Sequence, residues 1–138
     1  MDKKKIIHML NGALAQEHAC QIRYLTHAAV ITGPYAEVVA GRLKEIAEDE
    51  EKHASQLRDR ITALGGAPTM EVAREDLLPA TTLKQILDIN IEEEEKAIAL
   101  YKSVLREVQE EGDILFETIE EILQDEQEHR EELERLRE

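Results

Sequence analysis

Strong helix-breaking signals occur at four places in this chain, and they constrain its fold more than any other feature. Gly and Pro are the residues that most often end a helix. The breaks are Gly33-Pro34, Gly65-Gly66-Ala67-Pro68, Pro79 followed by the N-cap candidates Thr81-Thr82, and Gly112-Asp113. They leave four long segments that contain no such cluster. We expect helices at about residues 3–31, 35–64, 82–110 and 113–137.

The links between these segments predict how the helices are arranged. Each helix would be about 40 Å long at 1.5 Å per residue. Short first and last links join antiparallel neighbours, as is typical of four-helix bundles. The middle link, residues 65–81, is long enough at ~3.3 Å per residue to run the full length of a bundle. We therefore expect an all-α four-helix bundle, one domain over residues 1–138, with a long crossover and with the second and third helices parallel.

The acidic composition excludes several classes of function. The chain has 17 Lys and Arg against 31 Asp and Glu, which gives a net charge of −14. A surface of this sign suits neither a nucleic-acid backbone nor an anionic membrane. No apolar run approaches the ~18 residues that span a bilayer, and the start Met1-Asp2-Lys3-Lys4-Lys5 is unlike a signal peptide. We expect a soluble, cytoplasmic protein that binds neither nucleic acid nor membrane.

Every predicted helix carries a glutamate on its apolar stripe, close to the helix midpoint. Apolar residues recur along each helix at steps of three and four, and the glutamates, with two histidines, occupy positions that complete this pattern. Midpoints share one level in an antiparallel bundle, so these side chains should converge in the core. The six residues are Glu17, Glu50, His53, Glu94, Glu126 and His129. In the third helix, the neighbouring Glu93 is the alternative to Glu94 as the glutamate of this cluster.

A cluster of this kind needs a counter-charge. Burying even one unpaired carboxylate costs many kcal/mol or forces the group to protonate. Four glutamates carry four negative charges, and two divalent cations cancel them. Carboxylate and imidazole ligands together suit iron or manganese. The stripes therefore predict a dinuclear metal centre; the alternative is a layer of protonated glutamates hydrogen-bonded to histidine and tyrosine.

The arrangement occurs twice along the chain, which indicates a duplicated helical hairpin. In each half a first Glu is followed by a Tyr seven residues later, and 32 or 33 residues later by a second Glu with a His three residues beyond it. The two sets are Glu17, Tyr24, Glu50, His53 and Glu94, Tyr101, Glu126, His129. Tyr24 and Tyr101 are candidate catalytic residues that orient the metal ligands or supply a proton or an electron.

One Glu from each of two helices, with Glu-x-x-His from the other two, resembles the ferritin-like di-iron carboxylate signature. Within that superfamily the chain most resembles bacterioferritin, over nearly its whole length. The resemblance rests on Leu10-Asn11, Glu17, Tyr24-x-x-His27, Asp49-Glu50-x-Lys52-His53-Ala54, Leu64-Gly65-Gly66-Ala67-Pro68, Glu94 and Ile122-Leu123-x-Asp125-Glu126-x-x-His129. It implies two iron ions bridged by Glu50 and Glu126. Glu17 with His53 would complete one ion's ligands, Glu94 with His129 the other's, and Tyr24 would hydrogen-bond a ligand carboxylate.

The chain departs from bacterioferritin at three points. Glu51 stands where bacterioferritin has its haem-ligating Met, so we expect no haem. Glu45 stands where some bacterioferritins have an inner-surface His, which leaves iron passage to a mineral core open. The sequence ends at Glu138, after the fourth helix, whereas bacterioferritin has a fifth helix that helps to close its 24-subunit cage; cage formation is therefore open as well.

The resemblance implies a ferroxidase that oxidises Fe(II) with O2 or H2O2 and binds or stores iron. A second hypothesis is an enzyme that retains its dimetal cofactor: a rubrerythrin-like peroxidase, a manganese-catalase-like enzyme or a di-iron oxidase. A third is a helical interaction domain without catalysis. The ligand set alone does not choose between the first two, and it leaves manganese open beside iron.

A second apolar face on the first helix predicts an interface. It consists of Ala15, Ala19, Ile22, Leu25 and Ala29. A bundle needs only one stripe per helix for its core, so a second stripe requires another buried surface. We expect a homodimer through the first and second helices, with a higher oligomer left open.

Overall fold

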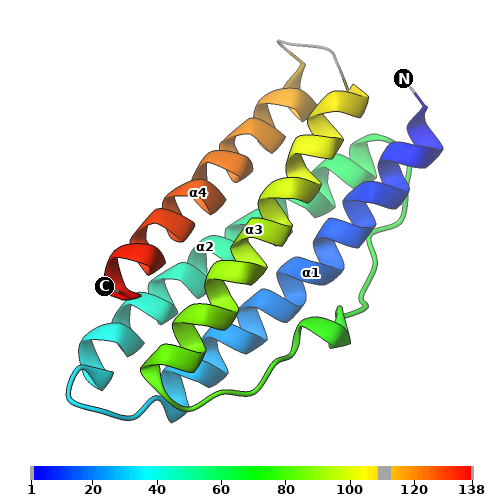
Figure 1. Ribbon diagram of the computed structural model, residues 1–138. Helices are drawn as coiled ribbons and strands as arrows, with labels where there is room; N and C mark the ends of the chain where they lie inside the picture. Colours follow the sequence, from blue (N-terminus) through cyan, green and yellow to red (C-terminus); the bar gives the residue numbers. More distant parts are fainter. Residues whose placement is uncertain (1, 109–112, 138) are drawn as a thin grey trace.

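The computed structural model describes residues 2–108 and 113–137 and contains four long helices (Figure 1). They are α1 (Lys3–Val30), α2 (Ala36–Ala63), α3 (Leu83–Val108) and α4 (Ile114–Arg137), with a short 3-10 helix, η1 (Arg74–Asp76), between α2 and α3. Each described boundary agrees with the sequence-based prediction to within two residues. The predicted end of the third helix at residue 110 and the break at Gly112 lie outside the described residues.

The helix ends follow from local sequence. Thr82 caps α3 as expected, because its hydroxyl accepts a hydrogen bond from Gln85 N–H at 3.2 Å. The Gln85 side chain in turn accepts from the backbone N–H groups of Thr81 and Thr82. Gly65 ends α2 in the left-handed region, with φ +87°. The next amide, Gly66 N–H, donates to Ile61 O at 2.9 Å, which satisfies a helix-terminal carbonyl.

The link between α2 and α3 runs back along the outside of α1, as the crossover prediction requires (Figure 1). Asn11 in α1 holds the start of the link: its side chain donates to Ala67 O and accepts from Thr69 N–H. Ala73 N–H donates to Ala15 O at 3.0 Å. At the other end of the bundle Thr32 and Thr82 form an isolated parallel bridge. α2 and α3 are therefore parallel.

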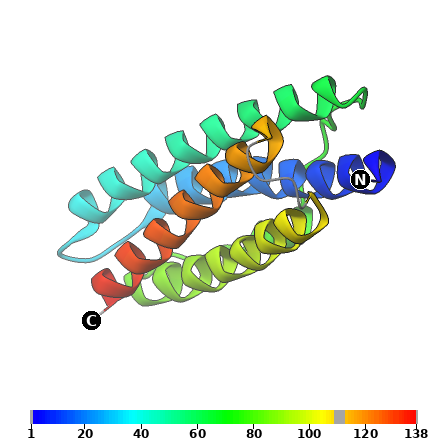
Figure 2. The same cartoon turned by 90° about the horizontal axis from the view of Figure 1, so that it is seen from above.

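The helices form two antiparallel pairs, α1 with α2 and α3 with α4, and Figure 2 shows these pairs side by side. α1 also packs on α3, and α2 meets α4 along a sparser contact. The apolar core is split into two clusters. One contains Leu10, Leu14, Leu57 and Ile119, and the other contains Leu43, Ile46, Ile86 and Leu133. The charged residues predicted for the core lie between these clusters.

The second apolar face of α1 is partly covered. Ala19 is fully buried, whereas Ile22 and Leu25 remain 45% and 50% exposed. Val38 on α2 is 70% exposed. Within residues 2–108 and 113–137, no helix combines the length and the apolar character needed to cross a membrane.

The stability of the folded chain should depend on its packed core. Ile119→Ala removes a fully buried side chain of α4 and should lower the free energy of unfolding by about 3 kcal/mol. Ile114→Ala, at a 63% exposed position at the start of α4, should change it by less than about 0.5 kcal/mol. Urea unfolding of the metal-free protein, followed by circular dichroism, measures both. Equal losses for the two variants would contradict this account of the core.

Candidate metal centre

The six side chains predicted for the centre of the bundle meet at one level. α1 and α3 contribute Glu17 and Glu94, and α2 and α4 each contribute a Glu and a His. All are at most 4% exposed. They form two overlapping groups, each able to offer ligand atoms within 4.8 Å of one another. One group is Glu17, Glu50, His53 and Glu126; the other is Glu50, Glu94, Glu126 and His129.

Glu94, and not its neighbour Glu93, belongs to the cluster. Glu93 turns to the other side of α3, where its carboxylate lies 3.5 Å from Arg23 Nη1 and 3.3 Å from Lys96 Nζ. Arg23 is itself buried, donates to Asn90 Oδ1 at 2.8 Å and lies over the Tyr24 ring. This ion-pair group joins α1 to α3 beside the cluster and leaves Glu94 as the α3 residue of the centre.

The donor atoms of the cluster lack hydrogen-bond partners. Among the described residues, eight buried side-chain nitrogen and oxygen atoms have none, and all eight belong to the six clustered residues. They are Oε2 of Glu17, both carboxylate oxygens of Glu50 and of Glu126, Oε1 of Glu94, and Nδ1 of His53 and of His129. Buried polar atoms are almost always paired. A set of unpaired carboxylate oxygens and imidazole nitrogens that face one another fits metal ligation.

The two tyrosines hold the glutamates of α1 and α3 crosswise. Tyr24 in α1 donates its hydroxyl proton to Oε2 of Glu94 in α3, at 2.6 Å. Tyr101 in α3 donates to Oε1 of Glu17 in α1, also at 2.6 Å. Each bond occupies one carboxylate oxygen and leaves the other directed into the cluster. The predicted hydrogen bond of Tyr24 to a glutamate of the cluster is thus present, and Tyr101 makes the equivalent bond.

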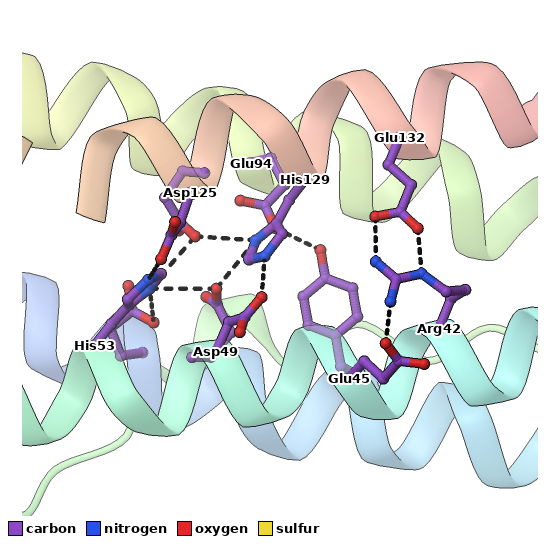
Figure 3. Close-up of polar contacts among 12 residues, drawn as sticks. Arg42, Glu45, Asp49, His53, Glu94, Asp125, His129 and Glu132 are labelled. Carbon is purple, nitrogen blue, oxygen red and sulfur yellow. Dashed lines mark hydrogen bonds and ion pairs between the residues drawn. The ribbon is translucent and has the colours of Figure 1, made fainter. Parts of the chain in front are cut away.

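Two aspartates hold the histidines in the same crosswise way. His53 Nε2 in α2 lies 2.8 Å from Asp125 Oδ2 in α4, and His129 Nε2 in α4 lies 2.8 Å from Asp49 Oδ2 in α2 (Figure 3). Each pairing orients the imidazole so that Nδ1 faces the cluster. Sequence analysis assigned no role to either aspartate. The signal was present as a repeated Asp-Glu-x-x-His, at residues 49–53 and 125–129.

The glutamates titrate unequally because they are buried together. Burial and the charge of Glu50 raise the pKa of Glu17 to about 8. The same two causes raise the pKa of Glu94 and that of Glu126. Burial opposes ionisation of Glu50 as well, but His129 and His53 outweigh it and lower the pKa of Glu50. Without metal, therefore, Glu50 carries the negative charge and Glu17 keeps its proton at neutral pH.

The histidines compensate part of that charge. Burial alone would lower the pKa of His53, but its contacts with Asp125, Glu17 and Glu50 reverse the effect and raise it. The pKa of His129 is raised in the same way, against burial, by Glu126, Glu50 and Glu94. Without metal both imidazoles are therefore cationic and offset part of the negative charge of the glutamates.

Comparison with known proteins agrees with this site. The family model for the ferritin-like domain matches residues 7–138. A bacterioferritin from Desulfovibrio desulfuricans is 33% identical over 129 residues, which cover 92% of this chain and 71% of that protein. The bacterioferritin structure from that species, described with its diiron site in different catalytic states, has a TM-score of 0.88 at 29% identity, covering 98% of this chain and 79% of that one.

Two other solved structures are similar over nearly the whole chain. A ferritin-like diiron-carboxylate protein from Bacillus anthracis has a TM-score of 0.93 at 30% identity, covering 100% of this chain and 99% of that one. A dodecameric thioferritin, the bacterioferritin-related protein from Bacteroides fragilis, has a TM-score of 0.89 at 28% identity. The match covers 99% of this chain and 86% of that one. With its four-helix bundle and its carboxylate and histidine groups able to bind metal, the chain belongs to the ferritin-like family and is related to bacterioferritin.

Proposed function

We propose that the protein binds two iron ions in the cluster and oxidises Fe(II) with O2 or H2O2, as a ferroxidase-type iron-binding protein. The observation that carries the proposal is the set of eight unpaired donor atoms. They divide into two sets of four: one oxygen from Glu17 or Glu94, one histidine Nδ1, and one oxygen from each of Glu50 and Glu126. Glu50 and Glu126 would then bridge the ions, and four carboxylates would balance two divalent charges.

The residues around the ions define what the chain contributes to the reaction. When bound, two Fe(II) ions supply two electrons, which with two protons reduce O2 to H2O2 or H2O2 to water. The four carboxylates favour the ferric state because their negative charge stabilises the higher oxidation state. Tyr24 and Tyr101 hold the outer glutamates, and Asp49 and Asp125 hold the histidines. Burial of the six ligands limits the access of water.

Iron is favoured over manganese by the relatives. Carboxylate and imidazole ligands accept either metal, but two of the similar structures are described as diiron proteins. The same ligand set would serve an enzyme that keeps both ions as a cofactor. Turnover distinguishes a storage protein from such an enzyme. A storage protein continues to take up iron beyond two ions per chain. A peroxidase or oxidase saturates at two ions and consumes peroxide catalytically.

Removing a bridging carboxylate should affect both ions. We expect about two Fe(II) per chain in the native protein under anaerobic titration, and ferric absorbance when air is admitted. Glu50→Ala and Glu126→Ala should each weaken binding by at least about ten-fold and suppress oxidation. Glu51→Ala is the matched control, because it removes the adjacent but exposed carboxylate of α2. Equal binding by Glu50→Ala and Glu51→Ala would refute the proposal.

Metal binding should release protons. The raised pKa values of His53 and His129, and that of Glu17 at about 8, mean that these groups hold protons at pH 7 that a metal ion must displace. Affinity should therefore rise as pH rises from about 6 to about 8, and fall as pH is lowered. Anaerobic titration in weak buffer with a pH indicator should show protons released as the metal binds at pH 7. Affinity that does not change with pH would show that the ligands are already deprotonated.

We also propose that a second copy of the chain covers the exposed apolar face of α1 and α2. Ile22, Leu25 and Val38 are each at least 45% exposed, and Met70 of the crossover, which is 95% exposed, lines the same hollow as Ile22 and Leu25. Such a patch is costly on a monomer. One structural neighbour is a named dodecamer, so self-association occurs among similar proteins.

Sedimentation velocity at micromolar concentration tests this interface. The native chain should sediment as a dimer or a larger oligomer, and Leu25→Asp should shift it towards monomer. Ile114→Asp is the control, because it puts the same charge at a 63% exposed apolar position on α4. A monomeric native protein, or identical behaviour of the two variants, would contradict the interface.

A further inference from the structure

The metal centre is covered more thinly on the side where α2 meets α4 than on the side between α1 and α3. On the opposite side, between α1 and α3, the fully buried Tyr24 and Tyr101 lie behind the outer glutamates. On the α2–α4 side the next layer consists of Asp49 and Asp125, whose side chains are 51% and 37% exposed. Each aspartate touches solvent and also contacts a histidine of the cluster. A cation from solvent therefore has its shortest protein path along this seam between α2 and α4.

Arg42 is the positively charged residue at the His129–Asp49 end of this seam, and Lys52 lies near Asp125 at its other end. Arg42 in α2 donates to both carboxylate oxygens of Glu132 in α4, with Nη2 to Oε1 at 2.5 Å, and its Nη1 donates to Glu45 (Figure 3). Glu132 follows His129 by one helical turn, and Glu45 precedes Asp49 by one turn. Residues at this spacing share a helix face. Arg42 thus engages two carboxylates that lie next to the His129–Asp49 pair.

The charges in this group act in opposite directions on an incoming divalent cation. Glu132 and Glu45 would attract it towards Asp49, but both are engaged by the guanidinium. Arg42 is itself a fixed positive charge that repels the cation. Its side chain is 36% exposed and that of Glu132 is 21% exposed, so the pair faces solvent where a cation approaches. Charges at the mouth of a binding path change association rates by ten-fold or more.

We propose that Arg42 slows the entry of divalent metal ions into the centre through the α2–α4 seam, by repelling them and by occupying Glu132 and Glu45. The inference rests on the proposed metal function of the cluster. It concerns the rate of entry and not the ligands, so the number of ions bound at saturation should be unchanged by substitution of Arg42. The competing explanation is structural: the ion pair ties α2 to α4, and its loss merely loosens the seam.

Two substitutions that break the same ion pair separate these explanations. Arg42→Gln removes a positive charge from the seam, and Glu132→Gln removes a negative one. A structural role predicts that both change the rate in the same direction. An electrostatic role predicts opposite directions, with faster entry in Arg42→Gln and slower entry in Glu132→Gln. Arg42→Lys keeps the charge but loses the two-pronged contact, so it should behave like the native protein.

The rate is measured by stopped-flow absorbance with Co(II), a divalent ion whose visible spectrum reports binding without oxidation by air. We expect Arg42→Gln to bind about three- to ten-fold faster and Glu132→Gln to bind slower by a similar factor. Both differences should shrink at high salt. The matched controls are Lys5→Gln and Glu107→Gln, which break an ion pair of 3.1 Å between α1 and α3, on the opposite side of the bundle. These should leave the rate nearly unchanged.

Each outcome decides one point. Rates that change in the same direction in Arg42→Gln and Glu132→Gln, or that do not change, would overturn the role of Arg42 while leaving the metal centre intact. Similar acceleration by Lys5→Gln would assign the effect to net charge and would also overturn it. Failure of the native protein to bind Co(II) at all would instead reject the proposed metal centre.

Discussion

The structure depends on one costly feature, the burial of four carboxylates and two imidazoles at the middle of a four-helix bundle. Each apolar cluster on either side is ordinary core packing, but the layer between them has unpaired acceptor and donor atoms that water does not reach. Without metal the cationic histidines reduce this cost, and in the proposed metal-bound form two divalent ions would balance the four carboxylates. The long helices place one glutamate each at the same level, and the crossover allows two hairpins to face each other across it.

The surroundings of the cluster are built as two related halves. Tyr24 and Tyr101 each hydrogen-bond a glutamate across the α1–α3 contact. Asp49 and Asp125 each hydrogen-bond a histidine across the α2–α4 contact. Four of the six clustered residues, Glu17, His53, Glu94 and His129, are therefore each held by a residue of a different helix. These contacts fix the direction of the donor atoms, which would reduce the reorganisation that metal binding requires. The two halves differ outside this layer, where Arg23 lies beside Tyr24 and Arg42 pairs with Glu132.

Much of this arrangement could be predicted from the sequence because it depends on periodicity. The helix boundaries, the crossover, and the convergence of the glutamates and histidines follow from breaks and from steps of three and four. The partners of His53 and His129 could not be assigned, since they depend on the register between α2 and α4, although Asp49 and Asp125 occupied equivalent places in the two halves. Arg23 and Arg42 were missed for a related reason: long charged side chains pair according to tertiary packing, which leaves no pattern along one helix.

The most direct test of the account is a crystal structure of the metal-loaded protein with anomalous scattering recorded at the iron edge. The account predicts two peaks between Glu50 and Glu126, one beside Nδ1 of His53 and the other beside Nδ1 of His129, with Tyr24 and Tyr101 still bonded to the outer glutamates. A single peak, a peak outside the six residues, or an empty cluster in crystals soaked with excess Fe(II) would contradict it.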